Sequence, residues 1–162
     1  MENEFVFFYG GPFSQWCESF FTIDGVKYNC AEQYMMAEKS RLFKDDETLD
    51  KIMDTSNPYD MKMVYGRNVK NFDVEIWQKH CRDIVYRGNY AKFTQNEDLK
   101  RDLLSTGNKE IVEASPTDTI WGIGMGEYEI PFIYDKKNWC GSNWLGIAIM
   151  QVRDKIRKDE NA

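Results

Sequence analysis

Two ionisable side chains, Glu32 and Lys39, stand seven residues apart in a segment of the 162-residue chain that also holds Met35, Met36 and Phe43. In an α-helix, positions seven apart differ by only about 20° around the axis and therefore share a face. A carboxylate and an amine on one half-apolar face can form an acid/base or nucleophile pair. The alternative is that Glu32 is the acid of a capping box that begins at Asn29 and that Lys39 is solvated.

An arginine follows a predicted helix end at Gly66-Arg67. Glycine at this point can adopt a positive φ and end the helix. An arginine presented from the following loop suits bidentate contact with a phosphate. The alternative is an ordinary surface arginine.

A carboxylate, an indole and two glycines lie within the loop Asp118–Gly124. Trp121 offers a flat face on which a planar base can stack, and Gly122 and Gly124 would let the backbone approach a ligand closely. The glycine pair does not belong to a βαβ unit, so a dinucleotide-binding fold is not predicted. The alternative is a buried tryptophan beside turn glycines.

Histidine and cysteine chemistry have little support in this chain. His80 is the only histidine and is interpreted as structural, and the four cysteines are widely spaced: Cys17, Cys30, Cys81 and Cys140. Without a C-x-x-C pair, the pattern does not indicate a zinc site. We expect no metal and no cofactor, and reduced thiols as in the cytoplasm.

Charge and length narrow the class of protein further. The chain has 21 basic and 27 acidic residues, a net charge of −6, which disfavours sequence-independent binding along nucleic acid. A small phosphorylated ligand needs only a few local cations. Met1–Phe8 lacks the basic start of a signal peptide, and no apolar run approaches the roughly 18 residues of a membrane span. These features predict a soluble, cytoplasmic protein with no membrane partner.

The elements that position these residues are predicted to be mostly helical. Short strands are expected at Phe5–Phe8 and Glu110–Ala114, with a hairpin over Phe20–Tyr28 that turns at Asp24-Gly25. Periodicity and caps predict helices over Cys30–Phe43, Asp45–Asp54, Asn57–Gly66, Asp73–Phe93, Asn96–Leu104 and Leu145–Ile156. Ser115–Asn143 is predicted to be a long irregular region of the kind that is often functional. We expect one domain over residues 1–162, α+β but mostly α, with a few short antiparallel strands.

Taken together and in order, the motifs resemble the NADAR or YbiA-like family over nearly the whole chain. The matching elements are Phe13-Ser14-Gln15-Trp16, Ala31-Glu32-Gln33-Tyr34-Met35-Met36-Ala37-x-Lys39, Gly66-Arg67, Trp77, Ala91-Lys92-Phe93, Leu104-x-Thr106-Gly107, Glu113-Ala114-Ser115, Asp118-x-x-Trp121-Gly122-x-Gly124 and Gly141-x-Asn143-x-Leu145-Gly146. Many relatives carry Asn where this chain has Gln15. The stretch Glu127–Trp139 carries no motif of the family.

The resemblance implies an N-glycosidase, a hydrolase that cleaves a ribosyl C–N bond in a phosphorylated riboside. The substrate would be a ribosylaminopyrimidine phosphate intermediate of riboflavin synthesis, or ADP-ribose on guanine of DNA. The resemblance implies catalytic roles for three positions. Glu32 would provide acid/base catalysis and charge stabilisation, Lys39 or secondly Lys92 would form a Schiff base, and Asp118 would hold a ribose hydroxyl or the attacking water. The implied binding roles are base stacking for Trp121, phosphate binding for Arg67, sugar binding for Asn143, and further substrate contacts for Trp77, Gly122 and Gly124.

Two other functions fit part of the pattern. A non-catalytic module that binds ADP-ribose or a related nucleotide would need the aromatic ring and the arginine but not Glu32 with Lys39. A structural or interaction protein would leave that pair idle on the surface.

Overall fold

Contacts within the chain divide it into two units, both seen in the computed structural model, which describes residues 4–162. The central unit is Gln15–Asn96, and the terminal unit combines Met1–Ser14 with Glu97–Ala162. Residues 1–3, the start of the segment examined for an export signal, lie outside the described residues. The single domain over 1–162 stays a prediction. Within residues 4–162, no helix has the length and apolar character needed to cross a membrane.

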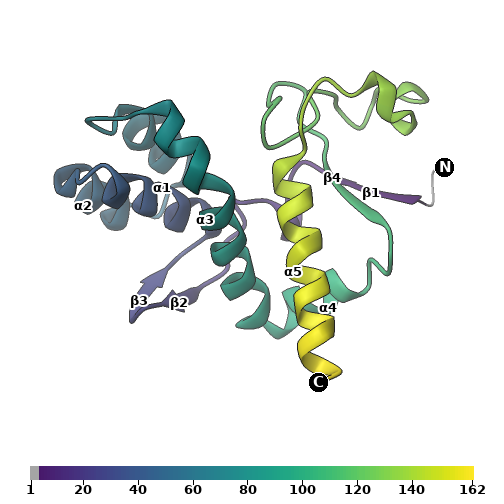
Figure 1. Cartoon of the computed structure of the whole chain (residues 1–162), viewed down its shortest axis with the longest axis horizontal. Helices are drawn as coiled ribbons and strands as arrows, with labels where there is room; N and C mark the ends of the chain where they lie inside the picture. The colour runs from purple at the N-terminus through teal and green to yellow at the C-terminus, as the bar shows by residue number, and fades with distance from the viewer. Residues whose placement is uncertain (1–3) are drawn as a thin grey trace. The chain divides into compact units, whose positions relative to one another are not determined.

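The central unit starts with the predicted hairpin, strands β2 (Phe21–Ile23) and β3 (Val26–Tyr28), which pair antiparallel. Asp24 and Gly25 have φ values of 51° and 79°, the left-handed conformations that a type I′ turn requires. Helices α1 (Ala31–Leu42), α2 (Asp46–Asp54) and α3 (Val74–Thr94) follow (Figure 1). The hairpin and these three helices confirm the corresponding predictions.

Helices α1 and α3 of the central unit pack closely because of a glycine. A Cβ at Gly88 would lie 2.8 Å from the Tyr34 ring, so a larger residue would force the helices apart. Cys81 and Ile84 are buried on the same stripe of α3, whereas Trp77 is half-buried. The predicted core-facing stripe of the long helix is therefore present.

The segment between α2 and α3 differs from the single helix predicted over Asn57–Gly66. This segment contains a π-helical stretch, η3 (Asp60–Tyr65), and a 3-10 turn, η4 (Gly66–Asn68). Gly66 has φ −60°, so the prediction that it ends a helix with a positive φ is wrong. A Cβ there would overlap Met36 Sδ and lie 2.7 Å from the Met61 carbonyl oxygen. Glycine is needed at this position for close packing against α1.

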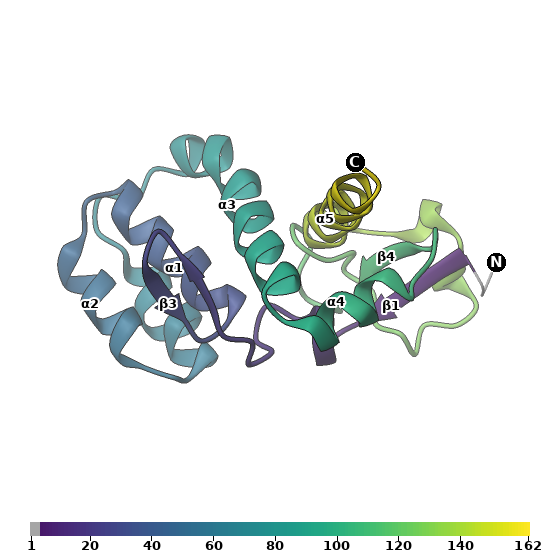
Figure 2. The same ribbon diagram turned by 90° about the horizontal axis from the view of Figure 1, so that it is seen from below.

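The terminal unit contains strands β1 (Phe5–Phe8) and β4 (Glu110–Glu113), which lie side by side in Figure 2 and pair in parallel. The few short strands were expected to be antiparallel, which is wrong for this pair. Parallel pairing needs a long crossover connection, here everything between Phe8 and Glu110, and a single strand's pattern does not reveal its pairing direction. Helices α4 (Glu97–Leu104) and α5 (Trp144–Glu160) match their predicted positions.

The irregular segment that joins β4 to α5 contributes to a core of its own. The buried residues of this cluster are Val112, Ala114, Ile123, Met125 and Ile133, and the half-buried rings of Phe5, Phe7, Tyr134 and Trp139 pack against it. Two short 3-10 turns, η5 (Phe132–Tyr134) and η6 (Lys136–Asn138), are its only helical parts within the described chain. Apolar packing therefore holds the long segment in an ordered form, as a functional loop requires.

Candidate active site

Glu32 lies in the first turn of α1, but one residue before the position that a capping-box acid occupies. Cys30, not Asn29, is the N-cap, and it makes no side-chain capping bond. The Asn29 amide donates to Oε1 of Gln33 at 2.8 Å, so Gln33 takes the part that the capping box assigns to Glu32. The capping-box interpretation of Glu32 is therefore wrong. The Glu32 side chain is 4% exposed, in a setting where a carboxylate can exert a strong electrostatic effect.

Lys39 lies on the same helix and interacts electrostatically with Glu32, as the seven-residue spacing predicts. Burial lowers the pKa of Lys39, and the Glu32 carboxylate acts in the opposite direction. The ammonium donates to the Gly66 carbonyl at 2.8 Å. It also lies 4.6 Å from the centroid of the Phe72 ring and 5.6 Å from that of Trp77. This cage of one carbonyl and two rings holds the amine in place.

Arg67, the residue predicted to bind phosphate, directly follows Gly66, whose carbonyl accepts the Lys39 hydrogen bond. The Arg67 side chain is exposed. Phe72, which is 44% exposed, was missed by sequence reasoning. The signal available in the sequence was an aromatic residue directly after Asn71, since asparagine is a common turn residue. In the structure, Asn71 has a left-handed φ of 63°. Lys39 beside two aromatic rings, with Arg67 next to Gly66 in the chain, suits a phosphorylated ligand with a planar base.

Lys92, on α3, is completely buried. Desolvation lowers its pKa to about 8, while electrostatic interaction with Cys17 and Cys30 acts in the opposite direction. The amine lies 5.0 Å from the centroid of the Phe93 ring. The central unit thus holds two lysines with a lowered pKa, the property that an amine nucleophile requires.

Asp118, in the terminal unit, shapes the loop in which it lies. One carboxylate oxygen, Oδ1, accepts hydrogen bonds from the amides of Ile120 at 2.9 Å and Trp121 at 2.8 Å. Its carbonyl accepts from the Gly124 amide at 3.1 Å. This is the local pattern by which aspartate stabilises turns. The predicted contact of Asp118 with substrate would then use its other carboxylate oxygen, Oδ2.

The Trp121 ring is half-buried and packs edge-on against Trp144, with the centroids 5.7 Å apart. The two glycines that follow are close to the protein's own chain. A Cβ at Gly122 would lie 2.9 Å from the Glu113 carbonyl oxygen, and Gly124 has a φ of 69°. The idea that these glycines serve the approach of a ligand is thus unsupported, because folding of the loop already requires both.

Asn143 precedes α5 and is 3% exposed. Its Nδ2 donates to the Ile111 carbonyl at 3.0 Å, and its Oδ1 accepts from the Glu113 amide at 3.0 Å. The side chain thus satisfies the backbone of β4 in the manner of a neighbouring strand. This geometry favours a structural role over the predicted contact with a sugar, which would have to replace these bonds.

Asn143→Ala is expected to destabilise the protein by about 1–3 kcal/mol, because two buried backbone groups of β4 lose their partner. Thermal unfolding measures this loss. Asn138→Ala is a matched control, since Asn138 is exposed and donates only one side-chain bond, to the Phe132 carbonyl. An unchanged melting temperature together with weaker substrate binding would instead support the predicted contact between Asn143 and the sugar.

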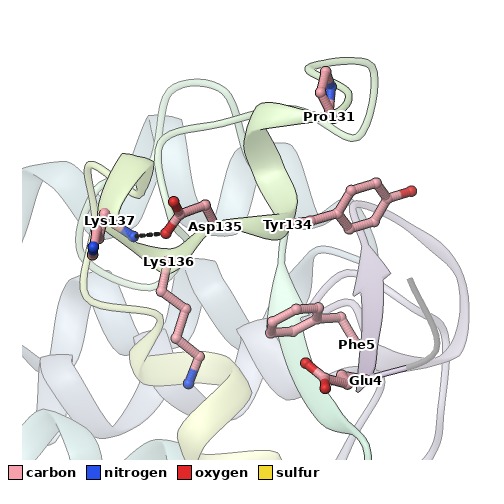
Figure 3. Close-up of a pocket in the computed structure, with 7 residues that line it drawn as sticks. All are labelled: Glu4, Phe5, Pro131, Tyr134, Asp135, Lys136 and Lys137. Atoms are coloured by element: carbon pink, nitrogen blue, oxygen red, sulfur yellow. Dashed lines mark hydrogen bonds between the residues drawn. The ribbon is translucent and has the colours of Figure 1, made fainter. Parts of the chain in front are cut away.

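A pocket of about 690 Å³ lies in the terminal unit, within and beside the segment that lacks a family motif (Figure 3). Its lining residues are Glu4, Phe5, Pro131, Tyr134, Asp135, Lys136 and Lys137. None of them is a predicted site residue. Lys136 forms an ion pair with Glu110, which reduces its availability to an anionic ligand. In residues 4–162, no group of three or more His, Cys, Asp or Glu side chains is arranged to hold a metal.

Comparison with known proteins places these observations in a family. The family model for the NADAR domain matches residues 7–157, and the chain belongs to the NADAR family, as its motifs predict. It is 45% identical over 166 residues to N-glycosidase R617 of Acanthamoeba polyphaga mimivirus, covering 94% of this chain and 96% of that protein. It is 39% identical to Protein irg-1 of Caenorhabditis elegans, over 81% of this chain and 62% of the relative.

A solved structure gives the same fold. The NMR structure of the Escherichia coli protein YbiA matches with a TM-score of 0.79 and 24% identity, covering 99% of this chain and 89% of that chain. The match confirms the predicted mostly helical, YbiA-like fold.

Proposed function

We propose that this NADAR-family chain is an N-glycosidase that hydrolyses the bond between nitrogen and C1 of ribose in a phosphorylated riboside. The relative from mimivirus bears the name N-glycosidase, as does YbiA of Escherichia coli at 25% identity. The observation that carries the proposal is the electrostatically linked pair of Glu32 and Lys39 on one face of α1, with the lysine pKa lowered.

Cleavage builds positive charge on the ribose, and the buried Glu32 carboxylate is suited to stabilise that charge. Opening of the sugar ring breaks the C1–O4′ bond and moves a proton from the base nitrogen to the ring oxygen, which leaves C1 doubly bonded to that nitrogen. The neutral amine of Lys39 adds to this C=N bond, and the proton that the amine loses passes to the Glu32 carboxylate. The bond from C1 to the base nitrogen then breaks, Glu32 returns its proton to the departing base, and C1 is left doubly bonded to the lysine nitrogen. Water hydrolyses the resulting imine, which releases the sugar phosphate and restores the amine.

The remaining residues supply binding. In the central unit, Arg67 takes the phosphate, and Phe72 and Trp77 lie beside the Lys39 amine. For the terminal unit, stacking of Trp121 on the base and a hold by Oδ2 of Asp118 on a ribose hydroxyl or the attacking water stay predictions from residue chemistry and family resemblance. No resident metal or cofactor enters these steps.

Two substrates share this chemistry: a ribosylaminopyrimidine phosphate of riboflavin synthesis and ADP-ribose attached to guanine in DNA. The net charge of −6 favours the small molecule over a nucleic-acid strand, and a cytoplasmic location fits it. The test is kcat/KM for release of sugar phosphate or ADP-ribose from each substrate, supplied separately. Faster release from the DNA adduct would reverse this preference, and release from neither would contradict the proposal.

A non-catalytic nucleotide-binding module is the second candidate. It is favoured by the cage around Lys39, because a carbonyl and two ring faces stabilise a charged ammonium, as phosphate binding requires. Such a module would be stabilised by ADP-ribose without releasing any product.

Trp121→Ala is expected to weaken ligand binding by about 1–3 kcal/mol, because a base loses its stacking partner. Titration calorimetry with the substrate or product measures the change. Trp139→Ala is the matched control, since this half-buried indole of the terminal unit packs on Phe5 and donates to the Ile133 carbonyl. Unchanged affinity in folded Trp121→Ala would remove Trp121 from the site.

A further inference from the structure

Gln15 connects the two helices of the central unit that carry candidate catalytic residues. Its backbone carbonyl accepts from the Glu32 amide at 2.9 Å, in the first turn of α1. Its side-chain Oε1 accepts from Nδ2 of Asn89, on α3, at 2.8 Å. Asn89 lies three residues before Lys92 and therefore on the same side of that helix. One residue thus joins the backbone of Glu32 to the Lys92 side of α3.

The bond to the Glu32 amide has a specific structural task. Amides in the first turn of a helix have no partner within the helix and are usually satisfied by a capping side chain. Cys30 provides no such bond, so the Gln15 carbonyl serves one of these amides from outside the helix. The position of Glu32 therefore depends on where the Gln15 backbone is held.

Asn89 holds the Gln15 side chain in one orientation. It is fully buried, and its Nδ2 also donates to the Val85 carbonyl at 2.9 Å. Turning the amide over would set Oδ1 against two acceptors, so the orientation is determined. Oδ1 has no hydrogen-bond partner among the described protein atoms.

We propose that Gln15 is a positioning residue for Glu32, a role that rests on the proposed N-glycosidase function. The Asn89 bond fixes the Gln15 side chain, the fixed residue presents its carbonyl to Glu32, and the first turn of α1 is thereby aligned. A small displacement of a catalytic group is enough to slow chemistry strongly, even when substrate still binds. We call the Gln15–Asn89 hydrogen bond the clamp. Its loss should therefore lower kcat rather than raise KM.

Gln15→Met tests the clamp, because methionine has a similar length but cannot accept the Asn89 bond. We expect kcat to fall about 10- to 100-fold, with KM within about twofold of wild type. Gln15→Glu keeps an acceptor facing Asn89 and should retain most of kcat. Asn89→Leu removes the donor from the other side and should reproduce the loss. It also provides the test if Gln15→Met does not fold.

Gln33→Met is the matched control for stability. Gln33 is buried in the same turn of α1, but its amide binds the Asn29 amide and the carbonyls of Ile52 and Thr55. The Gln33→Met substitution should lower the melting temperature and leave kcat of the folded protein near wild type. Unchanged kcat in Gln15→Met, or an equal fall in Gln33→Met, would overturn the positioning role. Absence of product release by wild type would instead contradict the proposed function.

Discussion

Glu32→Gln is expected to reduce turnover by about 10²- to 10⁴-fold and to leave a folded protein. Glutamine preserves the shape of the side chain but removes the negative charge and the proton that the leaving base takes. The capping role, which would have predicted a loss of stability alone, belongs to Gln33. Initial rates of sugar-phosphate release and a thermal melt of the same preparation measure both quantities.

Glu38→Gln is the control for this change. Glu38 is a half-buried glutamate of the same helix that pairs with Arg41 at 3.3 Å. Its variant should turn over at nearly the wild-type rate. If folded Glu32→Gln behaved in the same way, Glu32 would have no catalytic role.

Borohydride added during turnover is expected to attach the sugar phosphate permanently to one lysine. Reduction converts the imine to a stable secondary amine, and peptide mass spectrometry locates it. We expect the adduct on Lys39, because its amine is only half-buried, interacts with Glu32 and has a lowered pKa. Lys39→Met should remove both the adduct and most of the turnover, whereas Lys44→Met, at an exposed lysine just beyond α1, should change neither.

The pH profile separates the two lysines. A lysine with a lowered pKa has more neutral amine at a given pH, so the rate should rise with pH until that amine is deprotonated. An adduct on Lys92, with a rate that levels off above pH 8, would move the nucleophile to α3, because the pKa of Lys92 is about 8. Turnover without any lysine adduct would favour direct attack by water held by Glu32 or Asp118.

Local signals in the sequence predicted most of the elements. Asp24-Gly25 specifies its turn through two left-handed residues, and the apolar spacing along α3 specifies its buried stripe. The parallel pairing of β1 with β4 was not predictable in this way, since the partners are brought together by everything folded between them. Gly66 shows the same limit. A side chain cannot be accommodated there because Met36, on another helix, occupies the space.

The candidate site was predictable to the extent that it follows helix geometry. The shared face of Glu32 and Lys39 required only the residue spacing, and helix α1, which includes both residues, confirms it. The aromatic cage around Lys39 and the clamp between Gln15 and Asn89 join residues far apart in the chain. For Asn143, residue type alone suggested a sugar contact, whereas its two bonds to β4 indicate structure.

The most direct measurement of the central claim is the amount of sugar phosphate released per protein molecule from a ribosylaminopyrimidine phosphate. Wild type is expected to release many equivalents, and Glu32→Gln to release almost none while its melting temperature still rises with substrate. Thermal stabilisation of wild type by this substrate, with no release from it or from ADP-ribosylated guanine in DNA, would contradict an N-glycosidase and identify a binding module.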